Sequence, residues 1–486
     1  MMMINNDDDD DDDNEEIEHN VTNNTRKYDI KLAKKITKIL SVKRASDRCD
    51  WLNVGICLSN ISRSKLLRDT WIEFSKKWEG FTNDIECKKK WKEFKNYDKN
   101  LTIGSLKYWA EEDNPDEYKK IKKEAIADIM YHACAGKKDQ PTGAHADVAN
   151  VIYHHFKDLF VCANIRDNSW YYFNKENGGK WEETEQGHLL RFNLSDEIVD
   201  LFDEYKNKYK SLKEEDDDRY DIRHTNCLKI ILKLKDSSYK DKIMKECKGY
   251  FYDKKFIDKL DNQKNLLGFE NGIYDLNTSQ FRDGLPDDNI TMSCGLTLPV
   301  VSKPCHIKDI INQSKNMDNY EELNDGLNDF MKKVYPKVEV LEYTLRFLSS
   351  CLSGEIQEEK FYFWTGSGGN GKSKLVELID HSLGEYSGSL DVSFLTSKRG
   401  SSSAASPELE NVKNCRFVSM SEPEKEDVVY SGKLKQMSGG DKMTSRGLFK
   451  ETKRFKPQFK IILMCNDLPK LAGNDGGIWR RIEVVN

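Results

Sequence analysis

The stretch that decides the fold is FYFWTGSGGNGKSKLVELI, residues 361–379. Four aromatic residues run into a glycine-rich turn, which ends on Lys372 and Ser373 and leads into an apolar pattern of helical spacing. The turn fits G-x-x-x-x-G-K-[ST] at every fixed position. Glycines let the backbone curl and point its N–H groups inward, and the following helix adds the positive end of its dipole. The pattern predicts a phosphate-binding loop; a glycine-rich turn without a ligand is the alternative.

Each residue type in this loop has a chemical reason to be there. The lysine is expected to reach the β- and γ-phosphates of a nucleotide, and the serine hydroxyl to hold Mg²⁺. The backbone N–H groups of the remaining residues are expected to cradle the phosphates. The predicted nucleotide-binding residues are Gly366, Ser367, Gly368, Gly369, Asn370, Gly371, Lys372 and Ser373.

Two further apolar segments end on polar residues. CRFVSMSE (415–422) ends on Glu422, and FKIILMCND (459–467) carries Asn466 at the end of its apolar run. Three strands separated by helical or loop segments predict a parallel α/β sheet, and the carboxyl ends of its strands should share one edge. Glu422 is expected to hold Mg²⁺ and orient the attacking water, with Glu424 less favoured, and Asn466 to place that water. The alternative is that both residues merely end strands.

Basic residues are concentrated near these strands. Residues 442–460 hold seven lysines and arginines and one acid, with Phe449, Phe455 and Phe459 between them, which favours a nucleic-acid contact. Further on, Arg480 and Arg481 are adjacent in GGIWRRIEVV. They are expected to neutralise a γ-phosphate of a neighbouring subunit if subunits form a ring, unless they are an ordinary surface pair.

The composition sets limits on the class of protein. The 486 residues suffice for about three domains, and no apolar run approaches the ~20 residues of a membrane span. The twelve cysteines form no C-x-x-C pair, so we expect a reduced intracellular compartment, with neither secretion nor a disulfide framework. Residues 1–26 contain ten acids and one arginine and are predicted to be a disordered acidic tail.

Three folded regions are predicted after the tail. Residues 27–120 hold five of the nine tryptophans at helical spacing and predict a small all-α module whose tryptophans are core. Residues 140–305 predict a mainly helical α+β domain with hairpins at WYYFN…KWEET (170–184) and NLLGFENGIYDLNTSQFRDG (265–284). Residues 320–486 predict the α/β domain, and the helix EVLEYTLRFLSSCLSG before its first strand is expected to end on Gly354.

The motifs together resemble a known family. GSGGNGKS, SMSE, KLKQMSGGDKMTSR, FKIILMCNDLP and WRRI, in this order over about 340–486, resemble superfamily 3 helicases, in particular the poxvirus D5-like primase-helicases of large DNA viruses. FENGIYDLNTSQFRDGLPDDNIT is similar to the end of the domain that precedes the motor. The segments WLNVGICLSN and TIGSLKYWAEEDNP resemble the helical module that follows primase catalytic domains.

This sequence departs from the family in two ways. No aspartate pair lies on an apolar strand, so the primase catalytic domain is missing and priming is not expected of this chain. The sequence also stops at IEVVN, where relatives continue, so we expect the motor domain to be truncated at its C-terminal end.

The resemblance implies a P-loop NTPase of AAA+ type, a hexameric ring with ATP and Mg²⁺ between subunits, and single-stranded DNA in the pore. Glu422 then corresponds to the Walker B acid, Asn466 to the sensor, and Arg480 or Arg481 to the arginine finger. DNA-binding residues are expected on a hairpin, at Arg446, Phe449 and Lys450. The implied function is an ATP-dependent helicase of viral DNA replication in the host cytoplasm. The alternative is a non-translocating NTPase that loads or assembles a separate primase or polymerase.

Overall fold

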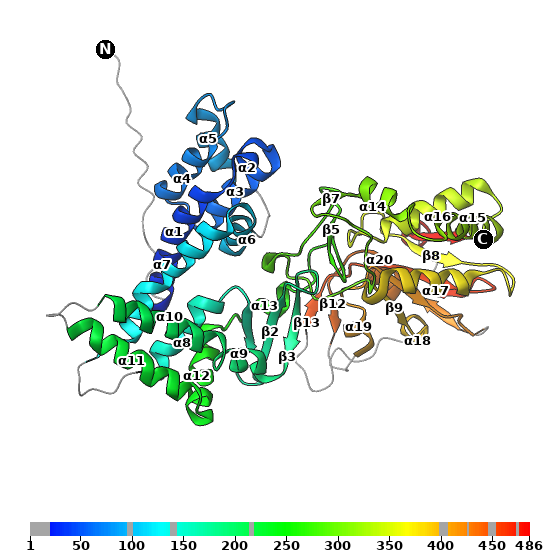
Figure 1. Ribbon diagram of the computed structural model, residues 1–486. Coiled ribbons are helices and arrows are strands. Elements are labelled where there is room, and N and C mark those ends of the chain that lie inside the picture. Colours follow the sequence, from blue (N-terminus) through cyan, green and yellow to red (C-terminus); the bar gives the residue numbers. More distant parts are fainter. Residues whose placement is uncertain are drawn as a thin grey trace, which may run out of the picture. The chain divides into compact units, whose positions relative to one another are not determined.

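The chain forms two compact units, Met1–Ile129 and Met130–Asn486. The computed structural model describes residues 20–94, 101–136, 143–212, 218–397, 407–424, 427–445, 453–472 and 476–486 (Figure 1). Residues 1–19 of the acidic tail predicted over 1–26 lie outside the described residues, whereas residues 20–26 belong to a helix that begins at Asn20, so the expectation of disorder is wrong for them. No helix in the described ranges is both long and apolar enough to cross a membrane.

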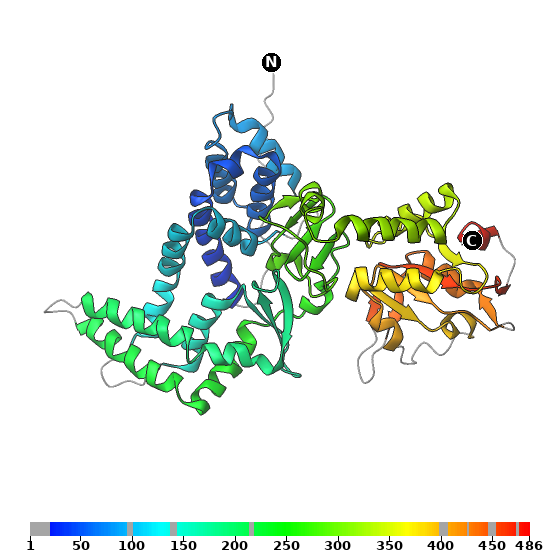
Figure 2. The same cartoon turned by 45° about the vertical axis from the view of Figure 1, so that its right-hand side comes forward.

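The first unit is helical, as the tryptophan spacing predicts (Figure 2). Its core is built around Trp71, which is fully buried and stacks on Trp51 at a ring distance of 4.8 Å. Trp91 and Trp109 are also buried, so these tryptophans are core, whereas Trp78 is 46% exposed. The helices are α1 (Asn20–Ile39), α2 (Val42–Ser46), α3 (Arg48–Ile61), α4 (Lys65–Ser75), α5 (Asp84–Glu93) and α6 (Ile103–Asp113), followed by α7 (Pro115–Ala133), which continues into the second unit.

The second unit begins with helices and a three-stranded antiparallel sheet in the order β1-β2-β3. The predicted hairpin is confirmed, because Phe173 pairs with Trp181 across β2 and β3. Gly178 and Gly179 form its turn at φ values of 65° and 78°, which favour glycine. The elements are α8 (His145–Phe156), β1 (Phe160–Asn164), β2 (Ser169–Asn174), β3 (Lys180–Thr184), α9 (His188–Asn193), α10 (Glu197–Ser211), α11 (Asp218–Leu234), α12 (Ser237–Tyr250) and α13 (Phe256–Lys259).

A second antiparallel sheet follows, here called the hairpin sheet, in the order β4-β5-β6-β7. The second of the two predicted hairpins lies in this sheet and is confirmed by the pairing of Leu267 with Tyr274. The strands are β4 (Leu266–Phe269), β5 (Gly272–Asp275), β6 (Gln280–Arg282) and β7 (Cys305–His306). Three helices lead from this sheet to the C-terminal part of the chain: α14 (Ile307–Ser314), α15 (Tyr320–Val334) and α16 (Val338–Ser350).

The expectation that the last of these helices ends on Gly354 is wrong. Helix α16 ends at Ser350, because the ammonium of Lys460 donates hydrogen bonds to the carbonyls of Ser350 and Ser353, at 2.6 and 2.7 Å. Gly354 is instead needed for close packing. A Cβ on this residue would lie 1.6 Å from Nη1 of Arg416.

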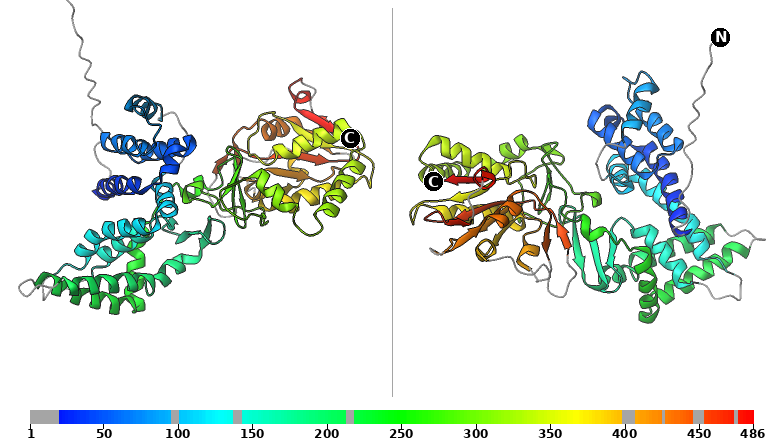
Figure 3. Two further views of the ribbon diagram at one scale, coloured as in Figure 1. Left: turned by 45° about the horizontal axis from the view of Figure 1, so that its top comes forward. Right: turned by 180° about the vertical axis from the view of Figure 1, so that it is seen from behind.

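The C-terminal part is a five-stranded parallel sheet in the order β16-β8-β14-β10-β9 (Figure 3). The three strands predicted from apolar runs are β8 (Phe361–Trp364), β10 (Phe417–Met420) and β14 (Lys460–Met464). The outer strands β9 (Ser387–Leu390) and β16 (Ile482–Val485) were not predicted, because β9 contributes only one apolar side chain and Glu483 interrupts the short apolar run of β16.

Helices cover both faces of this parallel sheet. Phe361 and Phe363 face one core with residues of α18, α19 and α20, whereas Tyr362 and Trp364 face the other with residues of α15, α16 and α17. All four residues are therefore buried, as a strand covered on two faces requires. The remaining elements are α17 (Lys372–Leu383), η4 (Gly384–Tyr386), α18 (Ser393–Thr396), α19 (Pro407–Asn411), β11 (Val428–Tyr430), α20 (Ser431–Ser438), β12 (Met443–Ser445), β13 (Lys453–Phe455), β15 (Lys470–Ala472) and α21 (Gly476–Trp479).

Candidate functional site

The glycine loop, residues 366–373, connects β8 to α17 at the carboxyl edge of the parallel sheet. Gly366, Gly369 and Gly371 have φ values of 138°, 79° and 89°, a region that side chains disfavour. Gly371 also lies against α15, since a Cβ there would be 2.7 Å from a methyl carbon of Val334. The three glycines therefore have a conformational reason, and Gly371 a packing reason, to be glycine.

Lys372 and Ser373 are the first two residues of α17, so both lie where helix N–H groups have no partner within the helix. The ammonium of Lys372 folds back over the loop and donates to the Gly366 carbonyl at 2.6 Å and to Oδ1 of Asn370 at 3.1 Å. Ser367, Gly368 and Ser373 are exposed. The loop thus presents a cation, a hydroxyl and a helix start to the same open region, which suits an anionic ligand.

Glu422 and Asn466 meet at this same edge. Glu422 follows β10 and Asn466 follows β14, and β14 lies between β10 and β8. One carboxylate oxygen of Glu422 accepts the backbone N–H of Asn466 at 2.9 Å, and the other accepts its side-chain amide at 3.0 Å. Burial and the charge of Glu422 raise the pKa of the Cys465 thiol to about 11, so the thiol is protonated at neutral pH. The alternative acid Glu424 is exposed, and its backbone N–H donates to Asp427.

The two arginines lie at the opposite edge of the sheet from the glycine loop. The Arg481 carbonyl accepts the N–H of Phe361, the first residue of β8, whereas the loop follows the last. The Arg481 side chain is 14% exposed and pairs with Glu359 at 2.8 Å, whereas that of Arg480 is 68% exposed and lies 3.8 Å from the same carboxylate. Within one chain, neither arginine is brought to the loop.

The basic residues predicted to contact nucleic acid lie in residues 442–460, here called the basic strip, of which the structure describes two parts. Arg446, Phe449 and Lys450, the predicted DNA-binding residues, lie outside the described residues. The strands on either side, β12 and β13, form an antiparallel pair in which Ser445 faces Lys453. The expectation that Phe455 and Phe459 interleave with the cations at a nucleic-acid surface is wrong, because both rings are buried in the core of the sheet.

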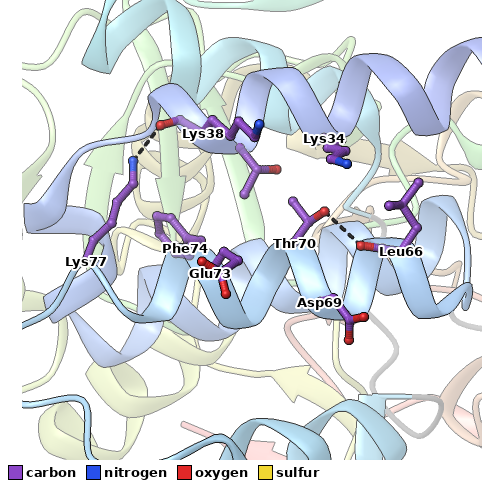
Figure 4. Close-up of a pocket in the computed structure, with 9 residues that line it drawn as sticks. Lys34, Lys38, Leu66, Asp69, Thr70, Glu73, Phe74 and Lys77 are labelled. Carbon is purple, nitrogen blue, oxygen red and sulfur yellow. Dashed lines mark hydrogen bonds between the residues drawn. The ribbon is translucent and has the colours of Figure 1, made fainter.

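Sequence reasoning missed a small cavity in the first unit, with a volume of about 220 Å³ (Figure 4). It lies between α1 and α4, with Lys34 and Lys38 on one wall and Asp69 and Glu73 on the other. Lys77 closes one end by donating to the Lys38 carbonyl at 2.7 Å. Its walls carry charges of both signs, and the Thr70 hydroxyl donates to the Leu66 carbonyl of its own helix at 2.8 Å. In the described part of the chain, no group of three or more His, Cys, Asp and Glu side chains could hold a metal ion.

Comparison with known sequence families matches three successive regions. Residues 33–110 match "Primase C terminal 2 (PriCT-2)", residues 149–316 match "D5 N terminal like", and residues 364–481 match "Family of unknown function (DUF5906)". The "Putative helicase L207/L206" of Acanthamoeba polyphaga mimivirus is 38% identical over 93% of this chain and 45% of its own length. The chain belongs to the D5-like family of large DNA viruses.

Other D5-like proteins are similar over the same region. The "Putative helicase 022R" of Frog virus 3 is 26% identical over 96% of this chain and 55% of its own length. The "Putative primase C962R" of African swine fever virus is 23% identical over 89% of this chain and 45% of its own length. The chain thus spans about half the length of the D5-like relatives it matches. A solved structure of the NrS-1 C-terminal region is 15% identical over 32% of this chain and 36% of that one, with a TM-score of 0.27, too distant a likeness to support any argument.

Proposed function

We propose that this chain is the ATP-hydrolysing motor region of a DNA helicase. The observation that carries the proposal is the convergence of three segments at one sheet edge: the glycine loop after β8, Glu422 after β10 and Asn466 after β14. Ligands of open parallel α/β sheets bind at the carboxyl ends of strands. Names of D5-like relatives, which include helicases and primases of large DNA viruses, support the assignment of the work to DNA replication.

In the proposed reaction the glycine loop is a P-loop that binds the phosphates of ATP. Lys372 exchanges its contacts with the loop for the β- and γ-phosphate oxygens, which makes it a phosphate ligand as well as a loop clamp. Ser373 and Glu422 offer the hydroxyl and carboxylate oxygens that Mg²⁺ prefers, and the ion would neutralise charge on the phosphates. Glu422 polarises the attacking water, and Asn466, held by Glu422, fixes where that water lies.

A ring of subunits, hexameric by family resemblance, completes this site. Stabilising charge on the transferred phosphoryl group calls for a cation, and Arg480 and Arg481 are at the far edge of their own sheet. The well-exposed Arg480 is free to approach the loop of an adjacent subunit. We assign it the finger role and assign Arg481, which is buried against Glu359, a supporting role.

Single-stranded DNA is the proposed track, with Arg446, Phe449 and Lys450 as contacts and the host cytoplasm as the place of action. A second function is favoured by a specific observation: with Phe455 and Phe459 in the core and Lys460 bonded to the end of α16, fewer groups of the basic strip are available for DNA. The chain would then be an NTPase that assembles or loads a separate primase or polymerase without moving along DNA.

An unwinding assay distinguishes the two functions. The chain is mixed with a forked DNA duplex and ATP, and strand release is measured for the parent protein, Lys450→Ala and Lys255→Ala. The helicase releases the strand, Lys450→Ala does not, and Lys255→Ala, which changes a lysine far along the chain from the strip, behaves as the parent. Hydrolysis of ATP by the parent with no strand release, and no effect of Lys450→Ala on DNA binding, would select the loading function.

A further inference from the structure

Among the described residues, Arg416 is the most deeply buried charged residue, and the proposed reaction does not use it. It lies one residue before β10 and is only 1% exposed. Its Nη1 donates to Oε1 of Gln458 at 2.6 Å, and its Nη2 donates to the carbonyls of Gln263 and Leu266 at 2.9 and 3.3 Å. Nε has no hydrogen-bond partner. Among the described residues, no carboxylate lies within ion-pair distance of this guanidinium.

Burying a cation against neutral acceptors is unfavourable, because three carbonyl-type oxygens replace its hydration only in part. Burial accordingly lowers the pKa of Arg416. An apolar side chain of similar size would fill the same space at lower cost. A polar group that is retained at such a position therefore points to the geometry it imposes on its partners.

The partners of Arg416 join two separate sheets. Gln263 and Leu266 lie at the start of the hairpin sheet, whereas Gln458 lies two residues before β14 of the parallel sheet. Gln458 is itself buried and donates its amide to the carbonyl of Asp261 at 3.0 Å. Arg416 and Gln458 thus attach the beginnings of β10 and β14 to the same segment, residues 261–266.

A tyrosine at the end of η4, directly before β9, reinforces the attachment. Tyr386 is fully buried; its hydroxyl accepts the N–H of Gly268 at 2.9 Å and donates to the carbonyl of Met292 at 3.3 Å. The carbonyl of Tyr386 accepts the N–H of Arg416 at 2.6 Å. Next to it, the Glu385 carboxylate accepts the N–H of Ser293 at 2.7 Å. The side chains of Tyr386 and Glu385 thus link the hairpin sheet and its following loop to the amino end of β9, and the Tyr386 carbonyl joins this end to Arg416.

We propose that Arg416 and Gln458 are positioning residues that lock the hairpin sheet to the two strands carrying Glu422 and Asn466. Each strand is held at its amino end by the lock and carries a site residue at its carboxyl end. Glu422 follows Arg416 by six residues, and Asn466 follows Gln458 by eight. An extended strand is stiff along its length, so the lock sets how far β10 and β14 are displaced along each other. That displacement determines whether Glu422 meets Asn466.

The same lock makes the hairpin sheet respond to the state of the site. A change in the Glu422–Asn466 contact that shifts β10 along β14 must also move Arg416 relative to Gln458. Because both side chains are hydrogen-bonded to residues 261–266, this segment would move with them. This inference rests on the proposed function for its kinetic consequence, but its structural content is independent of ATP hydrolysis.

Two variants separate the links of the lock. Arg416→Met removes the guanidinium and keeps an apolar stem. Gln458→Glu keeps an oxygen that accepts from Arg416, and its charge strengthens that contact, but it replaces the amide that donates to Asp261, so the bond from residue 458 to the hairpin-sheet region is lost while those from Arg416 remain. Arg282→Met is the matched control, because Arg282 is a partly buried arginine that pairs with Asp288 within the hairpin sheet region.

Steady-state kinetics give the first readout. Arg416→Met and Gln458→Glu are each expected to lower kcat for ATP at least tenfold while the dissociation constant of ATP stays within twofold of the parent, because the loop itself is intact. Arg282→Met should leave kcat unchanged. Equal kcat in Arg416→Met and parent, measured on folded protein, would overturn the proposal. A double variant with an effect much smaller than the product of the single effects is expected of one lock.

Hydrogen exchange gives a second readout that needs no activity. In both variants, amides near Glu422 and Asn466 should exchange faster together with those of residues 266–269, while α8 and α12 keep the exchange of the parent. Faster exchange confined to the neighbourhood of residue 416, or spread evenly over the chain, would show a role in folding only and overturn the lock. If the parent binds no ATP but the two variants show the expected change in exchange, the proposed function is contradicted and the lock stands.

Discussion

At the scale of single residues, the site depends on the hydrogen bonds of two side chains, Lys372 and Glu422. Lys372 donates hydrogen bonds to two positions of the glycine loop, Gly366 and Asn370, and its ammonium is also the group proposed to bind phosphate. Glu422 holds Asn466 through both of its oxygens. The loop clamp and the acid–amide pair therefore give the site a defined shape before a ligand binds, and such preorganisation lowers the cost of binding and catalysis.

Replacing Glu422 with Gln separates binding from hydrolysis. The amide keeps the size of the side chain but removes the charge that attracts Mg²⁺ and polarises water, so turnover should fall by roughly 10²-fold or more. ATP should still bind, which fluorescence titration with a labelled nucleotide would show. Glu424→Gln is the matched control and should hydrolyse ATP as the parent does. Loss of nucleotide binding in Glu422→Gln would instead make Glu422 a structural residue.

A charge cluster in the first unit predicts a dependence of stability on pH. Burial raises the pKa of Asp113, but hydrogen bonds from the side chain of Arg44 and the backbone of Ser41 outweigh it, and the pKa lies below its usual value. A carboxylate whose pKa is lower in the folded state adds stability above its unfolded pKa of about 3.9, and this is lost as the pH falls through the folded value.

Asp113→Asn should therefore destabilise the first unit at pH 7 by roughly 3 kcal/mol, because a buried ion pair loses one partner. The difference from the parent should shrink below about pH 4, where the parent carboxylate takes up its proton. Denaturant unfolding followed by the fluorescence of buried Trp71 measures both. Glu112→Gln, which changes a more exposed partner of Arg44, is the control and should cost about 1 kcal/mol or less. A penalty for Asp113→Asn that is equal at both pH values would contradict this account.

At the scale of secondary-structure elements, each strand of the parallel sheet has two functional ends. The carboxyl ends of β8, β10 and β14 carry the candidate site, whereas the amino ends of β10 and β14 meet Arg416 and Gln458. The parallel sheet thus lies between the candidate site and the segment at the start of the hairpin sheet. In the proposed lock, the stiffness of the strands carries a change at one edge of the sheet to the other.

The sequence predicts the strands that contain a clear apolar run and misses those that do not. The runs FYFW, FVSM and IILM predict β8, β10 and β14, because strands covered on both faces are mainly apolar. Nothing in SGSL marks β9, which is held by its pairing with β10 rather than by its own side chains. Arg416 could not be singled out either, since an arginine before a strand is usually a surface charge and its partners at 263 and 266 are distant in the sequence.

The two arginines before β16 should behave differently when replaced by alanine. Arg481→Ala removes a partly buried ion pair with Glu359 and should lower the Tm of the protein. Arg480→Ala removes an exposed side chain and should leave Tm and ATP affinity unchanged while hydrolysis is lost. Calorimetry and an ATPase assay on both variants give the comparison.

If Arg480 acts on an adjacent subunit, mixing Arg480→Ala with Lys372→Ala should restore part of the activity, since one supplies intact loops and the other supplies fingers. Light scattering must first establish that mixed assemblies form. An inactive mixture of assembled subunits would mean that Arg480 does not act between subunits.

At the scale of the whole molecule, three family regions lie in the order helical module, hairpin-containing region and parallel-sheet region, and D5-like relatives are about twice as long. The helical core of the first unit and the two-sided core of the parallel sheet are separate clusters. Each therefore has its own apolar interior, and the candidate site is assembled wholly from residues after β7.

The central claim is that DNA drives the ATP cycle of this motor, and the most direct measurement is the rate of ATP hydrolysis by the chain with and without single-stranded DNA. Lys372→Ala serves as the control for contaminating hydrolysis, because it lacks the proposed phosphate ligand but keeps the rest of the loop. The account predicts that saturating single-stranded DNA raises turnover by the parent several-fold and that Lys372→Ala is inactive in both conditions. Equal turnover with and without DNA, or parent-like turnover by Lys372→Ala, would contradict it.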